Sequence, residues 1–371
     1  MIINREYGPC TNGRELYNLN VGRANQKRGT DIVDLENIEI KVFDDLAKLP
    51  WFKFGEDGKL RVDPGAGVPE IIDDHSHLGW SYFFGGVINH LDGSRPLRYF
   101  YNYDFPQDVL NDKAHPTPDE SKLIERDIYM ILFRCPPIAR TQTAPHMIDE
   151  MDRFNVKNIC VLPVEIPIRS RHARQTFAAA AKCGGRLIPF AGVHPYTPSY
   201  EKRIRDMVAQ GARGFKYHPE FQFVAPDNKK TLRIFALLEE LDLPVLCHSG
   251  FTGAEPGFMR KLAALPRYRV IFESFPKLKF ILGHAGLNNI PEALAYTAEF
   301  PQVYLDLSGQ TAAATRGIIE KADTDRILYG SDWPFYPMGV TLARTLVATE
   351  GMPDEVRRKI LHDNAARIFK L

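Results

Sequence analysis

The chain has 371 residues, with 47 Lys and Arg against 46 Asp and Glu, so its net charge is +1 at pH 7. Hydrophobic residues make up 44% and charged residues 25%, which excludes a wholly disordered, collagen-like or coiled-coil protein. The balanced charge argues against a nucleic-acid or anionic-membrane partner, because both select a surplus of Lys and Arg. Neither an apolar run of transmembrane length nor a signal peptide is evident, and five scattered cysteines without a C-x-x-C motif predict a cytoplasmic protein.

Residues 1–69 differ from the rest of the chain, because they are polar and show little hydrophobic periodicity. One hairpin is predicted among them, since the turn residues Asp57-Gly58 lie between two short alternating segments, 51–54 and 60–62. We therefore expect residues 1–69 to form an N-terminal extension that packs on the main domain.

From residue 70 onward, short apolar segments alternate with segments of helical periodicity. Strands that are almost continuously apolar predict a parallel sheet covered on both faces, and eight of them closed into a ring form a (β/α)8 TIM-type barrel of the α/β class. An open doubly wound sheet is the alternative, which the lack of Gly-x-Gly-x-x-Gly after the first strand disfavours. The expected strands are 70–73, 157–164, 186–193, 214–217, 244–247, 279–282, 303–307 and 326–329, and the expected helices are 144–154, 171–183, 198–210, 229–241, 256–274, 290–299, 311–321, 339–350 and 354–369.

A long insert, residues 78–145, separates the first expected strand from the first expected helix. A connection of this length is rare in a compact domain, and it follows the strand end at which barrel active sites form. It is rich in aromatic residues, among them Trp80, Tyr82 and Phe100, which are too many for a solvated loop. We expect the insert to form a lid over the active site or, alternatively, a contact in a homodimer.

Histidine and aspartate side chains follow four of the expected strands. The first strand leads into His75-Ser76-His77, and strand alternation places both imidazoles on one face. The fifth and sixth strands lead into His248 and His284, and the eighth leads into Asp332. Because two such imidazoles can reach one ion at about 2.0–2.1 Å, the strand ends predict a metal centre.

Six motifs occur in order along residues 70–371. They are Ile72-Asp73-Asp74-His75-Ser76-His77, Gly214-Phe215-Lys216-Tyr217-His218-Pro219, Val245-Leu246-Cys247-His248-Ser249-Gly250, Phe280-Ile281-Leu282-Gly283-His284-Ala285-Gly286, Leu328-Tyr329-Gly330-Ser331-Asp332-Trp333-Pro334 and Ile360-Leu361-His362-Asp363-Asn364-Ala365-Ala366-Arg367. Together they resemble the amidohydrolase superfamily, specifically the branch related to aminocarboxymuconate semialdehyde decarboxylase.

The resemblance implies one divalent metal held by His75, His77, His248 and Asp332. Imidazole nitrogens with one carboxylate suit Zn²⁺ best, and Mn²⁺ is the alternative. The resemblance also implies that Asp332 is the general base and that His284 positions water or polarises the substrate.

Four further residues are candidates for substrate binding: Lys216, His218, Trp80 and Trp333. Three roles remain open for Lys216. It could be a carboxylated bridge between two metal ions, a partner for a substrate carboxylate, or a member of a structural ion pair.

The resemblance implies hydrolysis of an ester, lactone or amide bond in a small organic acid by metal-activated water. The alternative on the same scaffold is non-oxidative decarboxylation, or hydration, of a small aromatic or muconate-type acid. A non-catalytic metal-binding or interaction protein is the third hypothesis, which the presence of every expected site residue disfavours. The expected partner is a small-molecule substrate, with a homodimer as a possible assembly.

Overall fold

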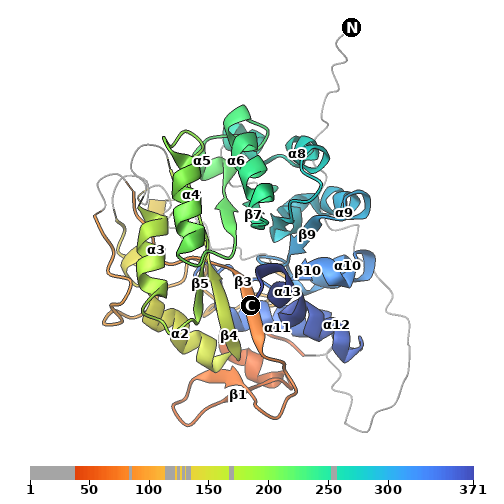
Figure 1. The fold of residues 1–371 in the computed structure, drawn as a ribbon. Helices are drawn as coiled ribbons and strands as arrows, with labels where there is room; N and C mark the ends of the chain where they lie inside the picture. Colours follow the sequence, from red (N-terminus) through yellow and green to blue (C-terminus); the bar gives the residue numbers. More distant parts are fainter. Residues whose placement is uncertain are drawn as a thin grey trace. The chain divides into compact units, whose positions relative to one another are not determined.

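The computed structural model describes residues 38–82, 86–112, 122, 126–127, 130, 135–166, 171–251 and 257–371. Parallel strands form its centre, and helices lie around them (Figure 1). Every expected barrel strand is found, although several are shorter than predicted. The strands are β3 (Ile71–Ser76), β4 (Val156–Val161), β5 (Leu187–Pro189), β6 (Phe215–Tyr217), β7 (Val245–His248), β8 (Phe280–Gly283), β9 (Val303–Asp306) and β10 (Ile327–Leu328).

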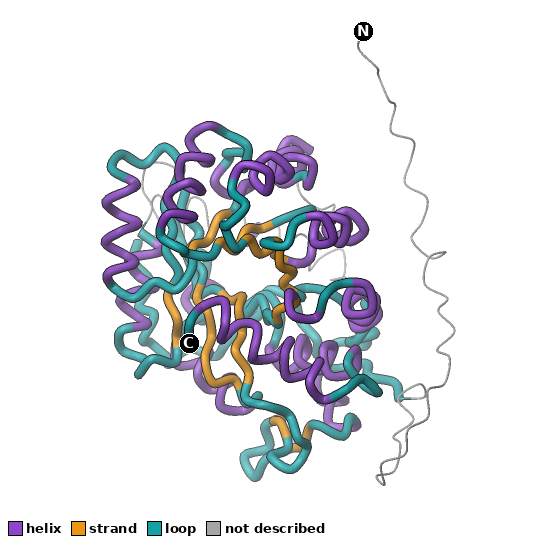
Figure 2. The backbone as a smooth tube through the Cα atoms, turned by 45° about the vertical axis from the view of Figure 1, so that its right-hand side comes forward, coloured by secondary structure: helices purple, strands orange, loops and turns teal. Residues whose placement is uncertain are grey.

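The strands pair into two sheets, in the orders β3-β4-β5 and β10-β9-β8-β7-β6. Single parallel bridges join the sheets at both edges. Ala191, just after β5, pairs with Phe215 of β6, and Ser76 of β3 pairs with Trp333, just after β10. These bridges complete the expected (β/α)8 barrel, which Figure 2 shows as a ring of strands inside a layer of helices. The second bridge also brings the first and fifth of the six motifs side by side.

An apolar cluster fills the interior of the barrel. Its strand residues precede the polar strand ends, as Leu246 precedes His248 and Ile281 precedes His284. The C-terminal helix α13 (Asn364–Phe369) completes the cluster, so the polar side chains are left to gather at the carboxyl ends of the strands. The members of the cluster are Ile72, Cys160, Leu162, Ile188, Phe190, Leu246, Ile281, Tyr304, Leu328, Ala365, Ile368 and Phe369.

Most of the expected helices are present, with ends shifted by a few residues. The expected helix 256–274 is divided, because Pro266 lacks the N–H that a continuous helix needs. A short helix after β6, α5, is not predicted by the sequence. The helices are α2 (Ala144–Arg153), α3 (His172–Ala180), α4 (Tyr200–Ala209), α5 (Pro219–Gln222), α6 (Lys229–Glu240), α7 (Gly257–Ala263), η4 (Leu265–Tyr268), α8 (Arg269–Ser274), α9 (Ile290–Glu299), α10 (Ala312–Lys321), α11 (Met338–Ala348), α12 (Asp354–Arg358) and η7 (Lys359–Asp363), with shorter turns η2 (Phe43–Lys48), η3 (Ile138–Arg140), η5 (His284–Asn289) and η6 (Thr324–Arg326).

The described part of the N-terminal extension contains the expected hairpin, β1 (Phe52–Phe54) with β2 (Leu60–Val62). Phe52 makes an edge contact with Phe154 at the end of α2, with ring centroids 6.4 Å apart. The hairpin and η2 are buried in the same apolar cluster as the barrel helices. Residues 1–37 lie outside the described part of the chain. Within the described residues, no helix is both long enough and apolar enough to cross a membrane.

The described part of the insert packs over the carboxyl ends of the strands. Trp80, Tyr82 and Phe100 form a buried cluster with Val164 and Ile166, which follow β4. The expected aromatic residues Phe83 and Phe84 lie outside the described residues, as does most of 113–134. The first half of the insert therefore covers the end of the barrel that carries the polar strand ends.

A buried carboxylate, Glu150 on α2, holds the segment after β10 in place. It accepts hydrogen bonds from Trp333 Nε1 at 2.7 Å, from Met338 N at 2.9 Å and from the Tyr99 hydroxyl. Burial raises the pKa of Glu150, and these three donors oppose that shift. Glu150 thus links the insert, α2 and the segment that carries Asp332.

We expect Glu150→Ala to destabilise the protein, because it leaves buried donors without an acceptor at about 1–3 kcal/mol each. The expected loss in the free energy of unfolding is about 3 kcal/mol or more, measured by urea denaturation of the full chain. The control is Glu320→Ala, which removes an exposed ion pair with Arg316 and should cost under about 1 kcal/mol. Equal losses for the two variants would contradict this role of Glu150.

Candidate active site and metal centre

Hydrogen bonds fix which nitrogen of each β3 imidazole is free to bind a metal. His77 Nδ1 lies 2.8 Å from the carbonyl oxygen of Leu162, and because a carbonyl only accepts, Nδ1 carries the proton. His75 Nδ1 donates in the same way to Asp306 Oδ2 at 2.7 Å. Each imidazole in its neutral form therefore presents an unprotonated Nε2, the arrangement found in carboxylate–histidine–metal sites.

Asp332 places a carboxylate opposite these two nitrogens. Its Oδ1 is 3.7 Å from Nε2 of both His75 and His77, and the three residues can offer ligand atoms within 4.8 Å of one another. The backbone N–H of Asp332 donates to the carbonyl of His75, and its φ of 54° lies in the left-handed region. Such strain in a non-glycine residue costs about 1–3 kcal/mol and is concentrated at functional sites. The barrel thus holds three of the four expected ligands together.

A glycine allows this close approach between the first and last barrel strands. A Cβ on Gly330 would lie 2.4 Å from Asp306 Oδ1 and 2.6 Å from Asp74 Oδ1, which no side chain could tolerate. Burial raises the pKa of Asp74 well above its usual value, and the neighbouring Asp306 raises it further. These surroundings favour the neutral form of Asp74, while Asp306 orients His75.

His248 and His284 form a hydrogen-bonded pair at the ends of β7 and β8. His284 Nδ1 faces Ser308, with 3.2 Å to its carbonyl oxygen and 2.8 Å to Oγ. Because the carbonyl only accepts, His284 donates there, and the proton in the 3.1 Å contact between the two imidazoles belongs to His248 Nδ1. His248 Nε2 is left unprotonated, buried and without a hydrogen-bond partner. Such an orphaned nitrogen fits the expectation that His248 binds a cation.

His248 Nε2 faces a second group of side chains. It lies 3.5 Å from Glu220 Oε2, and His218 stacks on the His248 ring with centroids 4.1 Å apart. His218, Glu220 and His248 also offer ligand atoms within 4.8 Å of one another. The structure therefore groups His75, His77 and Asp332, and it places the ligand nitrogen of His248 in an adjacent group.

Lys216 on β6 lies between these groups and is almost completely buried. Its Nζ is 3.0 Å from His75 Nε2. Burial lowers the pKa of Lys216 to about 8, while Asp332 and Asp306 oppose the shift. Lys216 therefore places a positive charge beside the ligand nitrogens, where it could pair with an anionic ligand.

Burial keeps the imidazoles of the site neutral. It lowers the pKa of His248 and His284 to about 3, and it lowers those of His75, His77 and His218 well below the usual value. The positive charge of Lys216 lowers all five pKa values further. Neutral imidazole is the form that binds a metal ion, so the donor set fits a divalent cation.

The two predicted tryptophans have different surroundings. The ring of Trp80 lies 5.4 Å from that of His77 and contacts Phe100 and Phe335, at 6.1 and 6.0 Å. Trp333 is fully buried, and its indole nitrogen donates to Glu150. Trp80 therefore lies beside His77, whereas Trp333 supports the segment that carries Asp332.

Sequence reasoning missed three residues of the site: Asp306, Ser308 and Glu220. Ser308 Oγ donates to Asp306 Oδ2 at 2.5 Å and accepts from His284, so both residues orient the histidines. Asp306 ends β9, and the strand-end rule that found the other residues could have found it. Glu220 lies on the unpredicted helix α5 and gave no comparable signal.

Solved structures with the same fold include two decarboxylases and one hydrolase. A 2,6-dihydroxybenzoate decarboxylase from Rhizobium has 16% identity and a TM-score of 0.54, and the match covers 81% of this chain and 98% of that one. A 5-carboxyvanillate decarboxylase from Novosphingobium aromaticivorans, complexed with manganese and 4-hydroxy-3-methoxy-5-nitrobenzoic acid, has 18% identity and a TM-score of 0.51 over 69% and 85% of the two chains. A probable 2-pyrone-4,6-dicarboxylic acid hydrolase from Acinetobacter baumannii, with citric acid bound, has 14% identity and a TM-score of 0.53 over 82% and 100%.

At these identities the likeness shows the fold alone. No curated protein matches the chain at a significant level. The family model described as "Amidohydrolase" matches residues 163–371, which is more than half of the chain and includes His248, His284 and Asp332. The chain therefore belongs to the amidohydrolase family.

Proposed function

We propose that the protein is a metal-dependent decarboxylase of a small aromatic carboxylic acid. The observation that carries the proposal is the aromatic cluster of Trp80, Phe100 and Phe335 beside His77, because it makes the surroundings of the ligand nitrogens apolar on that side. Two of the decarboxylases that share the fold are named for hydroxybenzoic acids. This reverses the order expected from the sequence, where hydrolysis came first.

We assign the metal to His75, His77 and Asp332, with His248 as the fourth ligand implied by the family resemblance. A divalent ion bound there would polarise oxygen atoms of the substrate. Zn²⁺ and Mn²⁺ both match nitrogen and carboxylate donors, and manganese is present in one of the decarboxylases compared. Elemental analysis of the purified protein decides between the two ions.

The residues of the chain account for the remaining steps. Lys216 pairs with the carboxylate of the acid, and Trp80 stacks on its ring. The bond between the ring carbon and the carboxylate carbon breaks, CO₂ leaves, and the electron pair stays on the ring carbon. Asp332 gives its proton to that carbon and is reprotonated from solvent, while His284 and Ser308 hold His248 in position.

Hydrolysis of a lactone is the second candidate, because the pyrone hydrolase shares the fold. In that reaction Asp332 would accept a proton from water rather than supply one to carbon.

A cytoplasmic location also stays a prediction. The four described cysteines, Cys135, Cys160, Cys183 and Cys247, are all free thiols.

The deciding experiment compares both reactions on the full chain loaded with Mn²⁺ or Zn²⁺. We expect CO₂ release from at least one acid in a panel of hydroxybenzoates that includes 2,6-dihydroxybenzoate and 5-carboxyvanillate. A pH-stat assay with 2-pyrone-4,6-dicarboxylate should show no acid release above the metal-only control. Acid release from the pyrone without CO₂ from any hydroxybenzoate would reject the decarboxylase in favour of the hydrolase.

A further inference from the structure

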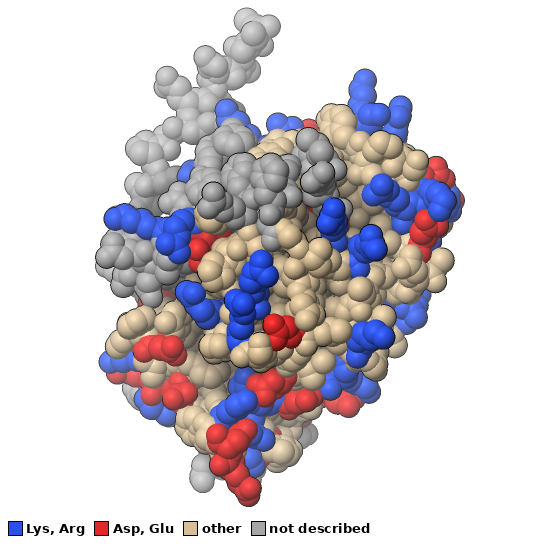
Figure 3. Space-filling view, turned by 90° about the vertical axis from the view of Figure 1, so that its left-hand side faces the viewer, with Lys and Arg blue, Asp and Glu red and all other residues tan. Residues whose placement is uncertain are grey.

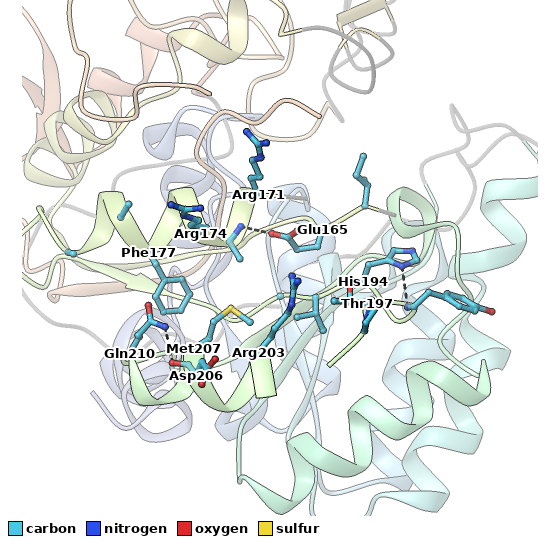
Figure 4. Close-up of a pocket in the computed structure, with 18 residues that line it drawn as sticks. Glu165, Arg171, Arg174, Phe177, His194, Thr197, Arg203, Asp206, Met207 and Gln210 are labelled. Carbon is cyan, nitrogen blue, oxygen red and sulfur yellow. Dashed lines mark hydrogen bonds between the residues drawn. The ribbon is translucent and has the colours of Figure 1, made fainter. Parts of the chain in front are cut away.

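A cavity lies outside the metal centre, between the barrel helices α3 and α4. It has a volume of about 900 Å³ and extends to the segments that follow β4 and β5 (Figure 4). This volume lies in the range of sites that hold small organic molecules. None of the residues assigned above to the metal or to the substrate lines it.

Apolar side chains from both helices form part of the cavity lining. Phe177 and Ala178 come from α3, Met207 comes from α4, and Val193 follows β5. Figure 4 shows the Phe177 ring and the Met207 side chain next to each other in the space between the helices. Phe177 and Met207 are both half-buried, so a ligand with an apolar body would remove their exposed surface from water.

Three arginines line the cavity: Arg171 just before α3, Arg174 on α3 and Arg203 on α4. Figure 4 shows Arg203 extending from its helix toward Glu165. Within the described residues, neither the Arg174 nor the Arg203 guanidinium has a hydrogen-bond or ion-pair partner. By contrast, Arg205, two residues further along α4, is paired with Glu201 and Glu240.

The acidic residues of the lining offset this charge only in part. Asp206 is paired with Lys202 at 2.7 Å. The Glu165 carboxyl accepts from the backbone N–H of Ala173 at 2.6 Å. Burial raises the pKa of Glu165 to about 8, while this hydrogen bond and the charge of Arg203 oppose the shift, so Glu165 offsets the arginines only in part. Figure 3 shows this side of the molecule, with Lys and Arg side chains near its centre; Asp and Glu side chains lie mostly toward the lower edge and also beside the central basic ones.

We propose that this cavity is a second binding site for a small carboxylic acid with an aromatic or aliphatic body. Guanidinium groups bind a carboxylate through paired hydrogen bonds, and Phe177 and Met207 receive the apolar part. An inorganic anion would satisfy the arginines but leave the apolar lining exposed to water. The site is separate from the metal centre, and the proposal does not depend on which reaction the metal centre catalyses.

The test follows the methyl signal of Met207 in metal-loaded full-length protein labelled with ¹³C-methyl methionine, and Met207→Leu assigns the signal. Benzoate is the probe, because its ring shifts a nearby methyl resonance. We expect a saturable shift with benzoate and none with inorganic phosphate. Arg174→Gln/Arg203→Gln should raise the benzoate concentration at half-saturation at least tenfold.

Arg213→Gln/Arg233→Gln is the matched control, because it removes the same charge from two arginines that do not line the cavity. Its half-saturation should stay within about twofold of the unmodified protein, since exposed charges at a distance are screened. Benzoate that binds at the metal centre leaves the Met207 signal unshifted and so is distinguished. The proposal fails if benzoate does not shift Met207, if phosphate shifts it equally, or if both double variants weaken binding alike.

Discussion

Replacing Asp332 by Asn should lower kcat by about 10²–10⁴-fold while the metal content stays close to that of the unmodified protein. The amide keeps an oxygen that can face His75 and His77, from which Oδ1 of the carboxylate is 3.7 Å away. The amide cannot hold or release the proton, so turnover is lost while binding is retained. The expectation holds for decarboxylation and for hydrolysis, because Asp332 moves a proton in both.

The measurements are kcat and KM on a substrate found by the CO₂ or pH-stat assay, together with metal content by elemental analysis. Asp325→Asn is the control, since it makes the same chemical change in an exposed carboxylate that pairs with Lys359. A variant Asp332→Asn that retains more than a tenth of the activity would remove Asp332 from the proton-transfer role, and His284 would be tested next.

The strand ends of the site were predictable because a parallel barrel collects them at one rim. His75, His77 and Asp332 come from opposite ends of the barrel sequence, and the bridge between Ser76 and Trp333 brings them together. The strand-end rule needs only a correct list of strands, and each strand could be recognised in the sequence as a short apolar segment. The rule places a side chain at the rim of the barrel but does not specify how its imidazole ring is oriented.

That orientation depends on contacts made in the folded protein. His248 turns its free nitrogen toward Glu220 because Ser308 and His284 fix the proton on the other side of the ring. Glu150 on α2 gives no sequence signal, since a single acid in an amphipathic helix usually faces water. The cavity between α3 and α4 is equally invisible, because it depends on how two neighbouring helices pack.

His75→Ala should abolish metal binding, taking the metal content from near one ion per chain to near zero. His75 supplies one of the two unprotonated Nε2 atoms at the end of β3, and Asp306 holds its ring in place, so alanine removes a ligand that the fold has oriented. A ligand present at 100 times its Kd stabilises a protein by about 2.7 kcal/mol. The metal-dependent rise in Tm should therefore disappear in the variant, and turnover should be lost with it.

His146→Ala is the matched control, because His146 is a half-buried histidine on α2, away from the metal ligands, whose ring is hydrogen-bonded to the carbonyl of Arg95. It should keep the metal, the rise in Tm and the activity. If His75→Ala retained one ion per chain, the ion would have to lie elsewhere, and His218, Glu220 and His248 form the group of described donors at this end of the barrel that does not include His75. Two ions in the unmodified protein would refute the single-metal assignment, because the second would then occupy that group or a bridge through Lys216.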